Sequence, residues 1–384
     1  MDFRVPFNRP CLAGNEYNYI AEAIANGQAS GDGPFTRRCH ELLERELLAP
    51  KVLLTTSCTH ALEMAAILLD CGPGDEIIIP SFTFVSAANA FALRGARIVF
   101  ADIRPDTLNL DESRLQSLIT KRTKAIVPVH YAGVACEMDT ICGLAREHGV
   151  RVVEDNAHGL FARYKGKPTG TFGCLSTQSF HETKNIICGE GGALVVNDPD
   201  LVERAVIIRE KGTNRSQFFR GQVDKYTWVD IGSSYLPSDL LAAFLLAQLE
   251  GRQEIQTKRR RIWDYYWRHL QGLTREKLAE EKKVRLPVVP AECEQAYHMF
   301  YLILPSLECR QALIAHLKEQ GILSVFHYVP LHLSTMGMKF GARECPVTED
   351  LSSRLLRLPF YNDLTEDDQA QVVGLIKDFF GVRD

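Results

Sequence analysis

The chain has 384 residues, 46% of them hydrophobic and 24% charged, which is typical of a globular protein long enough for two domains. Its formal net charge of −4 gives no electrostatic reason to expect a nucleic acid partner, and the one dense basic run, Lys258–Arg261, is more typical of a solvated helix face. No stretch approaches the roughly 18 apolar residues of a membrane-spanning helix, so no membrane segment is expected.

Short apolar runs alternate with helical patterns from Lys51 to Val196. This alternation predicts an α/β fold whose mostly parallel sheet is covered by helices on both faces. Ligands of such sheets bind beyond the carboxyl ends of the strands, so functional residues are expected just after them. The expected strands are 52–54, 76–80, 98–100, 125–129 and 151–155, and the expected helices are 61–69, 87–93, 111–119 and 138–148.

The pattern changes past Leu249. We expect a large domain over residues 1–250 and a smaller α+β domain over residues 251–384. The elements expected after the boundary are a long charged helix at 250–270, strand-like segments at 299–304 and 323–326, and helices at 310–320 and 366–380.

The first candidate site segment, Thr55–His60, lies between the first expected strand and its helix. Small hydroxyl residues such as Ser57 and Thr59 cap the free N–H groups at a helix start. The same N–H groups, together with the helix dipole, also bind phosphate. A plain helix cap explains this segment equally well.

Aromatic residues follow the second expected strand in Pro80–Val85. A ring such as that of Phe84 can stack on a flat cofactor when it lies just beyond a strand. Such residues more often belong to the core, so this segment alone does not decide between the two functions.

Asp155 ends the fifth expected strand, and His158 follows three residues later. A carboxylate at this place can pair with a pyridinium nitrogen and keep the ring protonated, so that the ring acts as an electron sink. A helix cap at Asp155 and an ordinary buried histidine at His158 are the structural alternatives.

Lys184 lies between a strand-like segment containing Ser179 and the glycine turn Gly189–Gly192. Its amine can project into a cleft, and a Schiff-base lysine needs the low pKa that a partly dry pocket or a nearby cation provides. Ser179 can hold a cofactor phosphate from the other side. Taken alone, a loop lysine is usually a surface residue, and the glycine run predicts only a hairpin turn.

Together and in this order, the segments resemble the DegT-type sugar aminotransferases, which belong to the fold-type I group of pyridoxal phosphate enzymes. The resemblance covers nearly the whole chain and implies the fold of that group, with a large cofactor-binding domain and a small C-terminal domain. The segments that carry it are Gly31–Thr36, Pro80–Val85, Val129–Gly133, Val153–Asp155, Ser179–Lys184 and Arg354–Pro359.

The resemblance implies a role for each cofactor-binding residue. Lys184 would bind pyridoxal phosphate as a Schiff base and move the proton, Asp155 would pair with the pyridine nitrogen, and Phe84 would lie against the ring. His158 occupies a position where many members have glutamine and some have histidine. The residues implied in holding the phosphate are Cys58, Thr59 and Ser179.

The family works as a homodimer whose active sites are completed by the partner subunit. Many members carry an asparagine that reaches the partner's cofactor phosphate, and we place Leu236 at that position here. The contact would then have to come from Ser233, Ser234 or Tyr235. Asn156 also replaces the small residue that usually follows the aspartate.

Two stretches, Glu210–Trp228 and Val134–Asp139, resemble the members that make dTDP-4-amino-4,6-dideoxygalactose. This closer resemblance implies L-glutamate as the amino donor and dTDP-4-keto-6-deoxyglucose as the acceptor. The gluco epimer, a 3-amino sugar or a sugar dehydration are alternatives, although the dehydratases have histidine in place of Lys184. A binding module without activity is disfavoured by Lys184 and Asp155. The residues expected to touch substrate are Arg215, Tyr235, His327, Tyr328 and His332.

The cysteines and the N-terminus bear on the cellular compartment. Eleven cysteines are scattered without a CxxC pair, so we expect reduced thiols and no metal site. No long apolar stretch follows Met1–Pro6, so no signal peptide is expected. Both observations predict a cytoplasmic protein.

Overall fold

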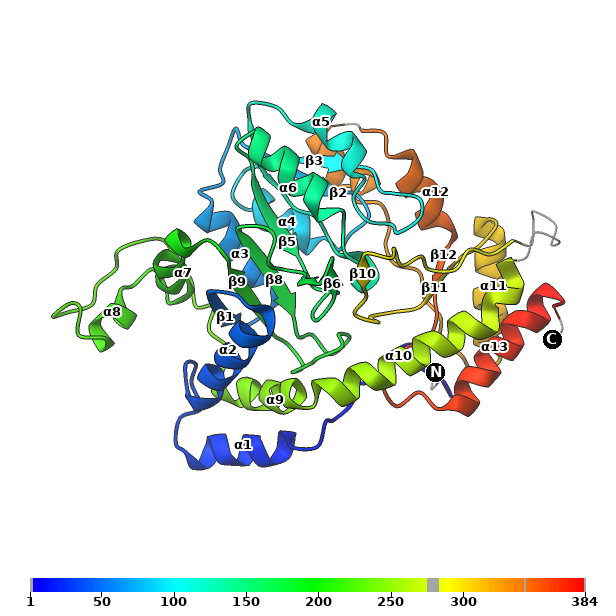
Figure 1. The fold of residues 1–384 in the computed structure, drawn as a ribbon, viewed down its shortest axis with the longest axis horizontal. Coiled ribbons are helices and arrows are strands. Elements are labelled where there is room, and N and C mark those ends of the chain that lie inside the picture. The colour runs from blue at the N-terminus through cyan, green and yellow to red at the C-terminus, as the bar shows by residue number, and fades with distance from the viewer. Residues whose placement is uncertain (1–2, 275–282, 342, 383–384) are drawn as a thin grey trace.

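The computed structural model describes residues 3–274, 283–341 and 343–382 (Figure 1). A seven-stranded sheet with the order β1-β9-β8-β5-β4-β2-β3 forms its centre. Only β9 runs antiparallel to its neighbours β1 and β8, so the predicted α/β fold with a mostly parallel sheet is confirmed. The strands are β1 Lys51–Thr55, β2 Glu76–Pro80, β3 Arg97–Ala101, β4 Thr123–Ile126, β5 Arg151–Asp155, β8 Leu175–Ser179 and β9 Gly192–Val196.

Helices cover both faces of the sheet, as the alternating pattern predicts (Figure 1). Two further helices near the N-terminus, which the sequence pattern did not single out, pack against the helix that precedes Gly251. The helices of this part of the chain are α1 Glu16–Ala25, α2 Pro34–Leu47, α3 Cys58–Leu68, α4 Ser86–Ala92, α5 Leu115–Leu118, α6 Met138–Glu147, α7 Val202–Arg209 and α9 Asp239–Glu250.

The side chains of each strand alternate between two apolar layers, because successive residues of a strand point to opposite faces. Leu53 of β1 packs in the layer of α3, α4 and α7, whereas its neighbours Val52 and Leu54 pack with α2 and α9. In β2, Ile78 points to a third cluster with α5 and α6. The strands are thus buried on both faces, which explains their continuous apolar sequence.

Several expected elements differ from the structure in length. The helix expected at 111–119 is a 3-10 turn, Glu112–Arg114, followed by the short α5. The strand expected at 323–326 forms only a single bridge, between Val325 and Arg357. The long charged helix is α10, Arg252–Leu270, and it is separated from α9 by Gly251, where a Cβ would lie 2.7 Å from the Cβ of Ala13. A close crossing of the N-terminal segment therefore requires glycine at this break.

The C-terminal part of the chain packs around an apolar core of its own. Val5, from the opposite end of the chain, joins this core and forms a bridge with Ile322. The domain division at residue 250 stays a prediction. The segment around Val5 packs with residues that follow this division in the sequence. The elements here are β11 Tyr301–Ile303, β12 Leu355–Arg357, α10, α11 Leu307–Glu319, α12 Pro346–Arg354 and α13 Glu366–Phe380.

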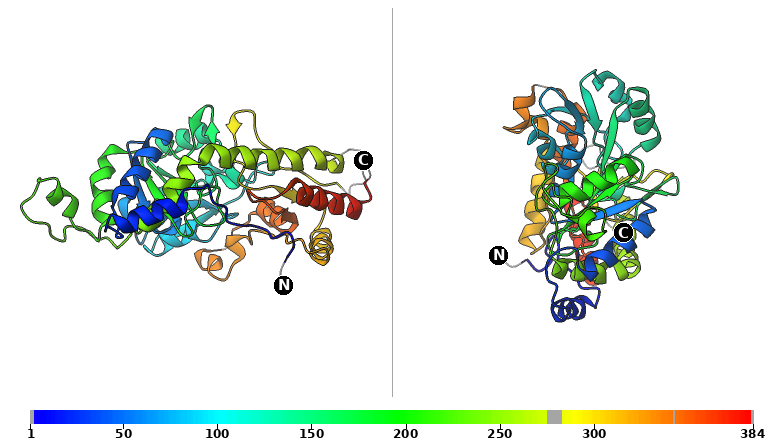
Figure 2. Two further views of the ribbon diagram at one scale, coloured as in Figure 1. Left: turned by 90° about the horizontal axis from the view of Figure 1, so that it is seen from below. Right: turned by 90° about the vertical axis from the view of Figure 1, so that its left-hand side faces the viewer.

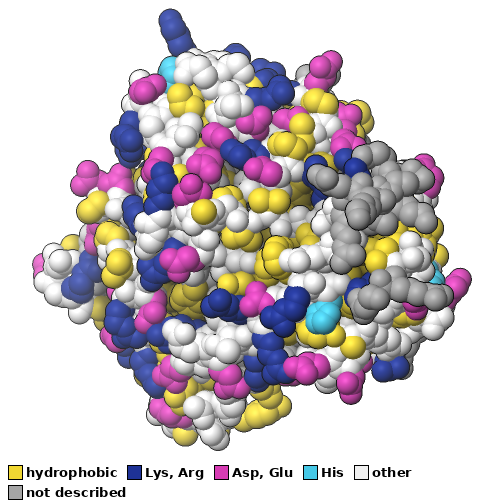
Figure 3. Space-filling view, turned by 45° about the vertical axis from the view of Figure 1, so that its right-hand side comes forward, with side chains coloured by type: hydrophobic (Ala, Val, Ile, Leu, Met, Phe, Trp, Pro, Cys, Tyr) yellow, Lys and Arg dark blue, Asp and Glu magenta, His cyan; other side chains and the backbone are white. Residues whose placement is uncertain are grey.

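One segment leaves the body of the molecule. It carries α8, Arg215–Phe219, and extends away from the rest of the chain in two perpendicular views (Figures 1 and 2). On the face seen in Figure 3, basic and acidic side chains are interspersed, and apolar side chains lie between them. Every helix of the described residues is too short or too polar to cross a membrane.

Candidate active site

A cavity of about 450 Å³ opens beyond the carboxyl ends of β5 and β8, where the fold places ligands of such sheets. Segments far apart in the sequence converge on it, from Phe7 to Arg357. The predicted site residues that line it are Cys58, Thr59, Phe84, Asp155, His158, Ser179, Lys184, His327 and Tyr328.

Lys184 lies in the loop between β8 and β9, where its backbone N–H donates to the carbonyl oxygen of His181 over 2.8 Å. The side chain is half-buried and lines the cavity. Burial, assisted by the Arg357 guanidinium, lowers the pKa of Lys184 to about 8. About one tenth of the Lys184 side chains is therefore unprotonated at pH 7, in the form that a nucleophile or general base requires.

Asp155 is the last residue of β5 and is only 5% exposed. Its Oδ1 accepts a hydrogen bond from the backbone N–H of Ala157 over 3.1 Å. Burial raises the pKa of this carboxyl above its usual value, so a cationic partner in the cavity would stabilise the charged form.

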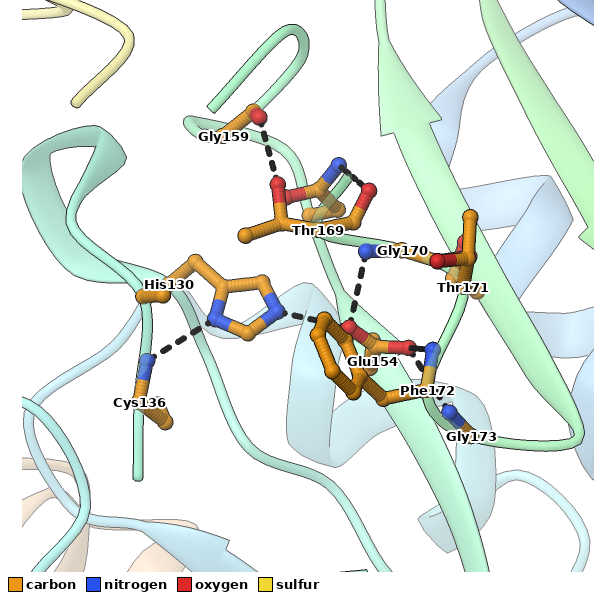
Figure 4. A network of polar contacts seen from close by, with 12 residues as sticks. His130, Cys136, Glu154, Gly159, Thr169, Gly170, Thr171, Phe172 and Gly173 are labelled. Carbon is orange, nitrogen blue, oxygen red and sulfur yellow. Dashed lines mark hydrogen bonds and ion pairs between the residues drawn. The ribbon is translucent and has the colours of Figure 1, made fainter. Parts of the chain in front are cut away.

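A buried polar network holds the strand end that carries Asp155 (Figure 4). The neighbouring Glu154 points to the other face and is fully buried. Its carboxylate accepts hydrogen bonds from the backbone N–H groups of Gly170, Phe172 and Gly173, at 2.6 to 2.8 Å, and from Nε2 of His130 at 2.9 Å. These bonds fix the backbone at β5, and with it the direction of the Asp155 side chain.

The start of α3 forms another wall of the cavity. The Ser57 side chain caps the helix by accepting from the backbone N–H of His60 over 3.1 Å, and the hydroxyls of Thr59 and Ser86 lie 2.7 Å apart. A Cβ at Gly192 would lie 2.4 Å from the backbone nitrogen of Cys58, so only glycine lets β9 approach this turn. Free N–H groups at a helix start suit a phosphate.

Two histidines stack beside Lys184. The rings of His158 and His298 are 4.3 Å apart at an angle of 20°, and burial holds the pKa of both well below the usual value. Nδ1 of His298 donates to Oδ1 of Asn185 over 2.9 Å, while Nδ2 of Asn185 donates to the carbonyl oxygen of Ala296 over 2.6 Å. This pair of bonds ties the lysine loop to the segment that follows α10.

The residues around the cavity fit pyridoxal phosphate. They offer an amine with a lowered pKa, a buried carboxylate, and a capped helix start rich in hydroxyls. His158 also lines the cavity, and its buried Nδ1 has no hydrogen-bond partner among the described residues. Among the described residues, no group of three or more His, Cys, Asp or Glu side chains is arranged for a metal ion.

Three of the residues expected to touch substrate lie outside this cavity. Arg215 pairs with Glu210 over 2.9 Å on the projecting segment. Tyr235 is 5% exposed and contacts the ring of His60. Both ring nitrogens of His332 are engaged, by Ser81 over 2.6 Å and Glu349 over 3.0 Å. His332 and Tyr235 therefore have structural explanations, whereas Arg215 pairs with Glu210 and lies over the ring of Phe219.

The Leu236 side chain packs against its own chain, close to Gly31. A Cβ at Gly31 would lie 2.8 Å from the Cβ of Leu236, so this side chain packs against the backbone ahead of α2. Its packing gives it a structural role here, and the cross-subunit contact expected near this position stays untested.

Sequence reasoning missed Phe7, His298 and Arg357, which all line the cavity. Arg357 stands between leucines in Leu355–Leu358, and His298 precedes an apolar run. A single charged or polar residue in an apolar strand is a usable signal, because such a residue is rarely buried without a function or a partner.

The family that this chain matches consists of aminotransferases, in agreement with the residues that line the cavity. A sequence model of the DegT/DnrJ/EryC1/StrS aminotransferase family matches residues 10–377. The spore coat polysaccharide biosynthesis protein SpsC of Bacillus subtilis is 31% identical over 387 residues, which cover 97% of this chain and 96% of SpsC.

Two solved structures share the fold over their whole length. PseC of Helicobacter pylori, an aminotransferase involved in the biosynthesis of pseudoaminic acid, is 26% identical with a TM-score of 0.88, and the match covers 99% of this chain and 100% of PseC. The PLP-form of Spr1654 from Streptococcus pneumoniae is 25% identical with a TM-score of 0.88, and the match covers 98% of each chain.

Proposed function

Because the chain belongs to the DegT/DnrJ/EryC1/StrS aminotransferase family, we propose that it transfers the amino group of L-glutamate to the 4-keto carbon of dTDP-4-keto-6-deoxyglucose. The products would be dTDP-4-amino-4,6-dideoxygalactose and 2-oxoglutarate. At the level of the family, the chain is a sugar aminotransferase that uses pyridoxal phosphate. The proposal adds the donor, the sugar and the configuration of the product.

The observation that supports catalysis at this cavity is that Lys184 and Asp155 both line it. When bound, pyridoxal phosphate supplies an electron sink for the carbon that loses its proton. Asp155 would hold the ring nitrogen in its protonated form, and the start of α3 with Ser179 would hold the phosphate. With a pKa of about 8, the Lys184 amine can remove the α-proton of the donor in the first half of the reaction and, in its protonated form, protonate the sugar carbon in the second half.

The choice of sugar rests on the resemblance of residues 210–228 and 134–139 to the members that make the galacto product. A direct test mixes the protein with dTDP-4-keto-6-deoxyglucose and L-glutamate and assigns the product by NMR. We expect small ring coupling constants at the amino carbon, as an axial amine requires. Large couplings would identify the gluco epimer, and the absence of any amino sugar would refute the proposed substrate pair.

The competing reaction is a dehydration of the sugar with the same cofactor. Lys184 argues against it, because the dehydratases of this type carry histidine at that position. A Lys184→His variant offers the control: it should lose amino transfer, whereas wild-type protein supplied with L-glutamate should release the amino sugar and no dehydrated sugar.

We also propose that the protein acts as a cytoplasmic homodimer whose active sites are shared. The free state of all eleven cysteines is compatible with that compartment. The projecting segment around α8 supports the dimer, because it exposes large apolar side chains such as Phe219 and Trp228, and neither they nor Arg215 line the cavity that contains Lys184.

A further inference from the structure

We propose that Arg357 binds the α-carboxylate of the amino donor through the free edge of its guanidinium group. The proposal deepens the aminotransferase function and takes L-glutamate as the donor proposed above. It assigns to a residue of the small C-terminal core the task of orienting the donor over Lys184.

Among the arginines that the structure describes as buried, Arg357 differs from the others because no described residue offers an oxygen acceptor to its side chain. Among the described residues, Arg209 pairs with Asp32 over 2.7 Å, Arg259 donates to the carbonyl oxygens of Tyr297 and His298, and Arg310 donates to a carbonyl oxygen. Arg357 is 8% exposed, and its one side-chain hydrogen bond runs to a histidine nitrogen. Burying a charge in this way is costly unless an anion completes the site.

The free atoms form one edge of the guanidinium. Nη1 of Arg357 donates to Nδ1 of His327 over 3.1 Å. Nε is buried without a partner, and the described residues provide no hydrogen bond to Nη2. Nε and Nη2 lie side by side on the plane of the group, so together they match the two oxygens of one carboxylate.

The arginine is held rigidly, so that the edge has a fixed direction. It ends β12, and its backbone exchanges hydrogen bonds with Val325 at 2.7 and 3.2 Å. Its guanidinium lies over the ring of Phe7, with 5.0 Å to the ring centroid. Burial lowers the pKa of His327 to about 4, so this neighbour is neutral and leaves the positive charge of Arg357 uncompensated.

The position of Arg357 favours the α-carboxylate over other anions. Arg357 and Lys184 line the same cavity, and the α-carboxylate is attached to the carbon whose proton Lys184 would remove. The cofactor phosphate would lie at the start of α3, next to Cys58 and Thr59. A nucleotide diphosphate carries a nucleoside that needs space outside the site, whereas the edge of Arg357 is buried and suits a compact group.

The experiment measures the reaction with the amino donor alone, before any sugar is added. The cofactor-loaded protein is mixed with L-glutamate, and the change of its visible absorbance gives the donor concentration for half-maximal rate. For Arg357→Gln we expect this concentration to rise about 10- to 100-fold, the range for a lost charge-assisted hydrogen-bonded pair. Arg357→Lys should fall between the two, because it keeps the charge but not the planar edge.

Two truncated donors identify the carboxylate. 4-Aminobutyrate lacks the α-carboxylate of glutamate, and L-2-aminobutyrate lacks the side-chain carboxylate. If Arg357 binds the α-carboxylate, 4-aminobutyrate should be an equally poor donor for wild type and for Arg357→Gln. This donor has no α-carboxylate, so removing the arginine that would bind that group should cause no further loss. L-2-aminobutyrate should still lose about 10- to 100-fold in the variant.

The matched control is Arg310→Gln, a buried arginine that is also 8% exposed but does not line the cavity. Its glutamate dependence should stay within about twofold of wild type, and the melting temperatures of all variants show whether they fold. Inhibition by dTDP is measured in parallel. The proposal is overturned if Arg357→Gln keeps its glutamate dependence, or if the variant loses affinity for dTDP instead. A wild type that uses glutamate but not the dTDP sugar would refute the proposed substrate and leave the role of Arg357 standing.

Discussion

Lys184 is useful as an acid–base group because the fold buries it. Its pKa of about 8 compares with roughly 10.4 for an exposed lysine. At pH 7 the Lys184 amine is therefore unprotonated in about one tenth of the molecules, whereas an exposed lysine is unprotonated in fewer than about one in a thousand. The unprotonated form is the reactive one, and its fraction increases with pH until it saturates about one to two pH units above the pKa.

We therefore predict that the rate of pyridoxal phosphate uptake by cofactor-free protein rises with pH, is half-maximal near the Lys184 pKa of about 8, and levels off about one pH unit higher. The measurement follows the visible absorbance of the bound cofactor across a pH series. Lys184→Arg serves as the control and should show no such band. A rate that continues to rise beyond about pH 10 would mean that the amine titrates like an exposed lysine.

Glu154 is the residue on which the strand end beside Asp155 depends. Glu154→Gln replaces an acceptor of four hydrogen bonds with an amide that has one acceptor oxygen. We expect the free energy of unfolding to fall by about 2–4 kcal/mol, because buried backbone donors lose their partner. Urea unfolding measures the loss, and Glu182→Gln, at an exposed site, should change it by less than about 0.5 kcal/mol.

Ligands of mostly parallel sheets bind beyond the carboxyl ends of the strands, and this rule explains which site residues could be predicted from the sequence. Asp155 and Ser179 end strands, and Cys58 and Lys184 follow strands within a few residues, so their convergence at one sheet edge follows from the fold class. Arg357 obeys no such rule, because it lies in β12 and reaches the cavity through the packing of the C-terminal core against the rest of the chain. Such packing depends on tertiary contacts that periodicity does not encode.

At the scale of elements, apolar patterning predicted strands and helices well wherever burial decides the structure. α13 begins and ends where the pattern places it, at Glu366 and Phe380. The helix expected at 111–119 shortened, because Asp111 caps a 3-10 turn over Glu112–Arg114. The two N-terminal helices were missed because their apolar faces are covered by α9, a helix about 200 residues later in the chain.

Gly192 allows β9 to approach the start of α3 closely, because it has no side chain. In Gly192→Ala the new Cβ would lie 2.4 Å from the backbone of Ser57 and Cys58, so β9 or the start of α3 must move. We expect a loss of about 1–3 kcal/mol in stability and weaker cofactor binding, since the phosphate end of the cavity shifts. Thermal unfolding and cofactor titration measure the two effects.

Gly143→Ala is the matched control for that variant. Gly143 lies inside α6, and nothing lies within 4 Å of the position of its Cβ. Alanine there should stabilise the protein by about 0.5–1 kcal/mol and leave cofactor affinity unchanged. A loss of cofactor affinity in both variants would show that the effect does not come from the turn at Cys58.

At the scale of the whole molecule, the cavity joins two cores. Asn185, next to Lys184, bonds to Ala296 and His298, and Arg357 enters from β12. The lysine loop and the donor-binding edge proposed for Arg357 are thus held in one frame by contacts between the two parts of the chain. A shift of the C-terminal core would change the distance between Lys184 and a donor held by Arg357, so we expect catalysis to depend on how the two cores pack.

The projecting segment around α8 exposes several large apolar side chains to solvent. Phe219 is 70% exposed and Trp228 is 76% exposed, and other large apolar side chains lie close by in sequence, namely Tyr226, Val229 and Ile231. Exposed apolar clusters of this kind mark protein interfaces. We therefore expect the 43.2 kDa chain to sediment as a dimer, with this segment in the interface.

A double variant, Phe219→Ser with Trp228→Ser, tests that expectation. It should sediment as a monomer at micromolar concentration, because the loss of two large aromatic anchors costs an interface several kcal/mol. Met338→Ser, which changes a side chain 60% exposed on a distant segment, should remain dimeric. Amino transfer should fall with dimer content if Arg215 completes the partner's site. A double variant that stays dimeric would exclude this segment from the interface, and one that is monomeric but fully active would refute shared active sites.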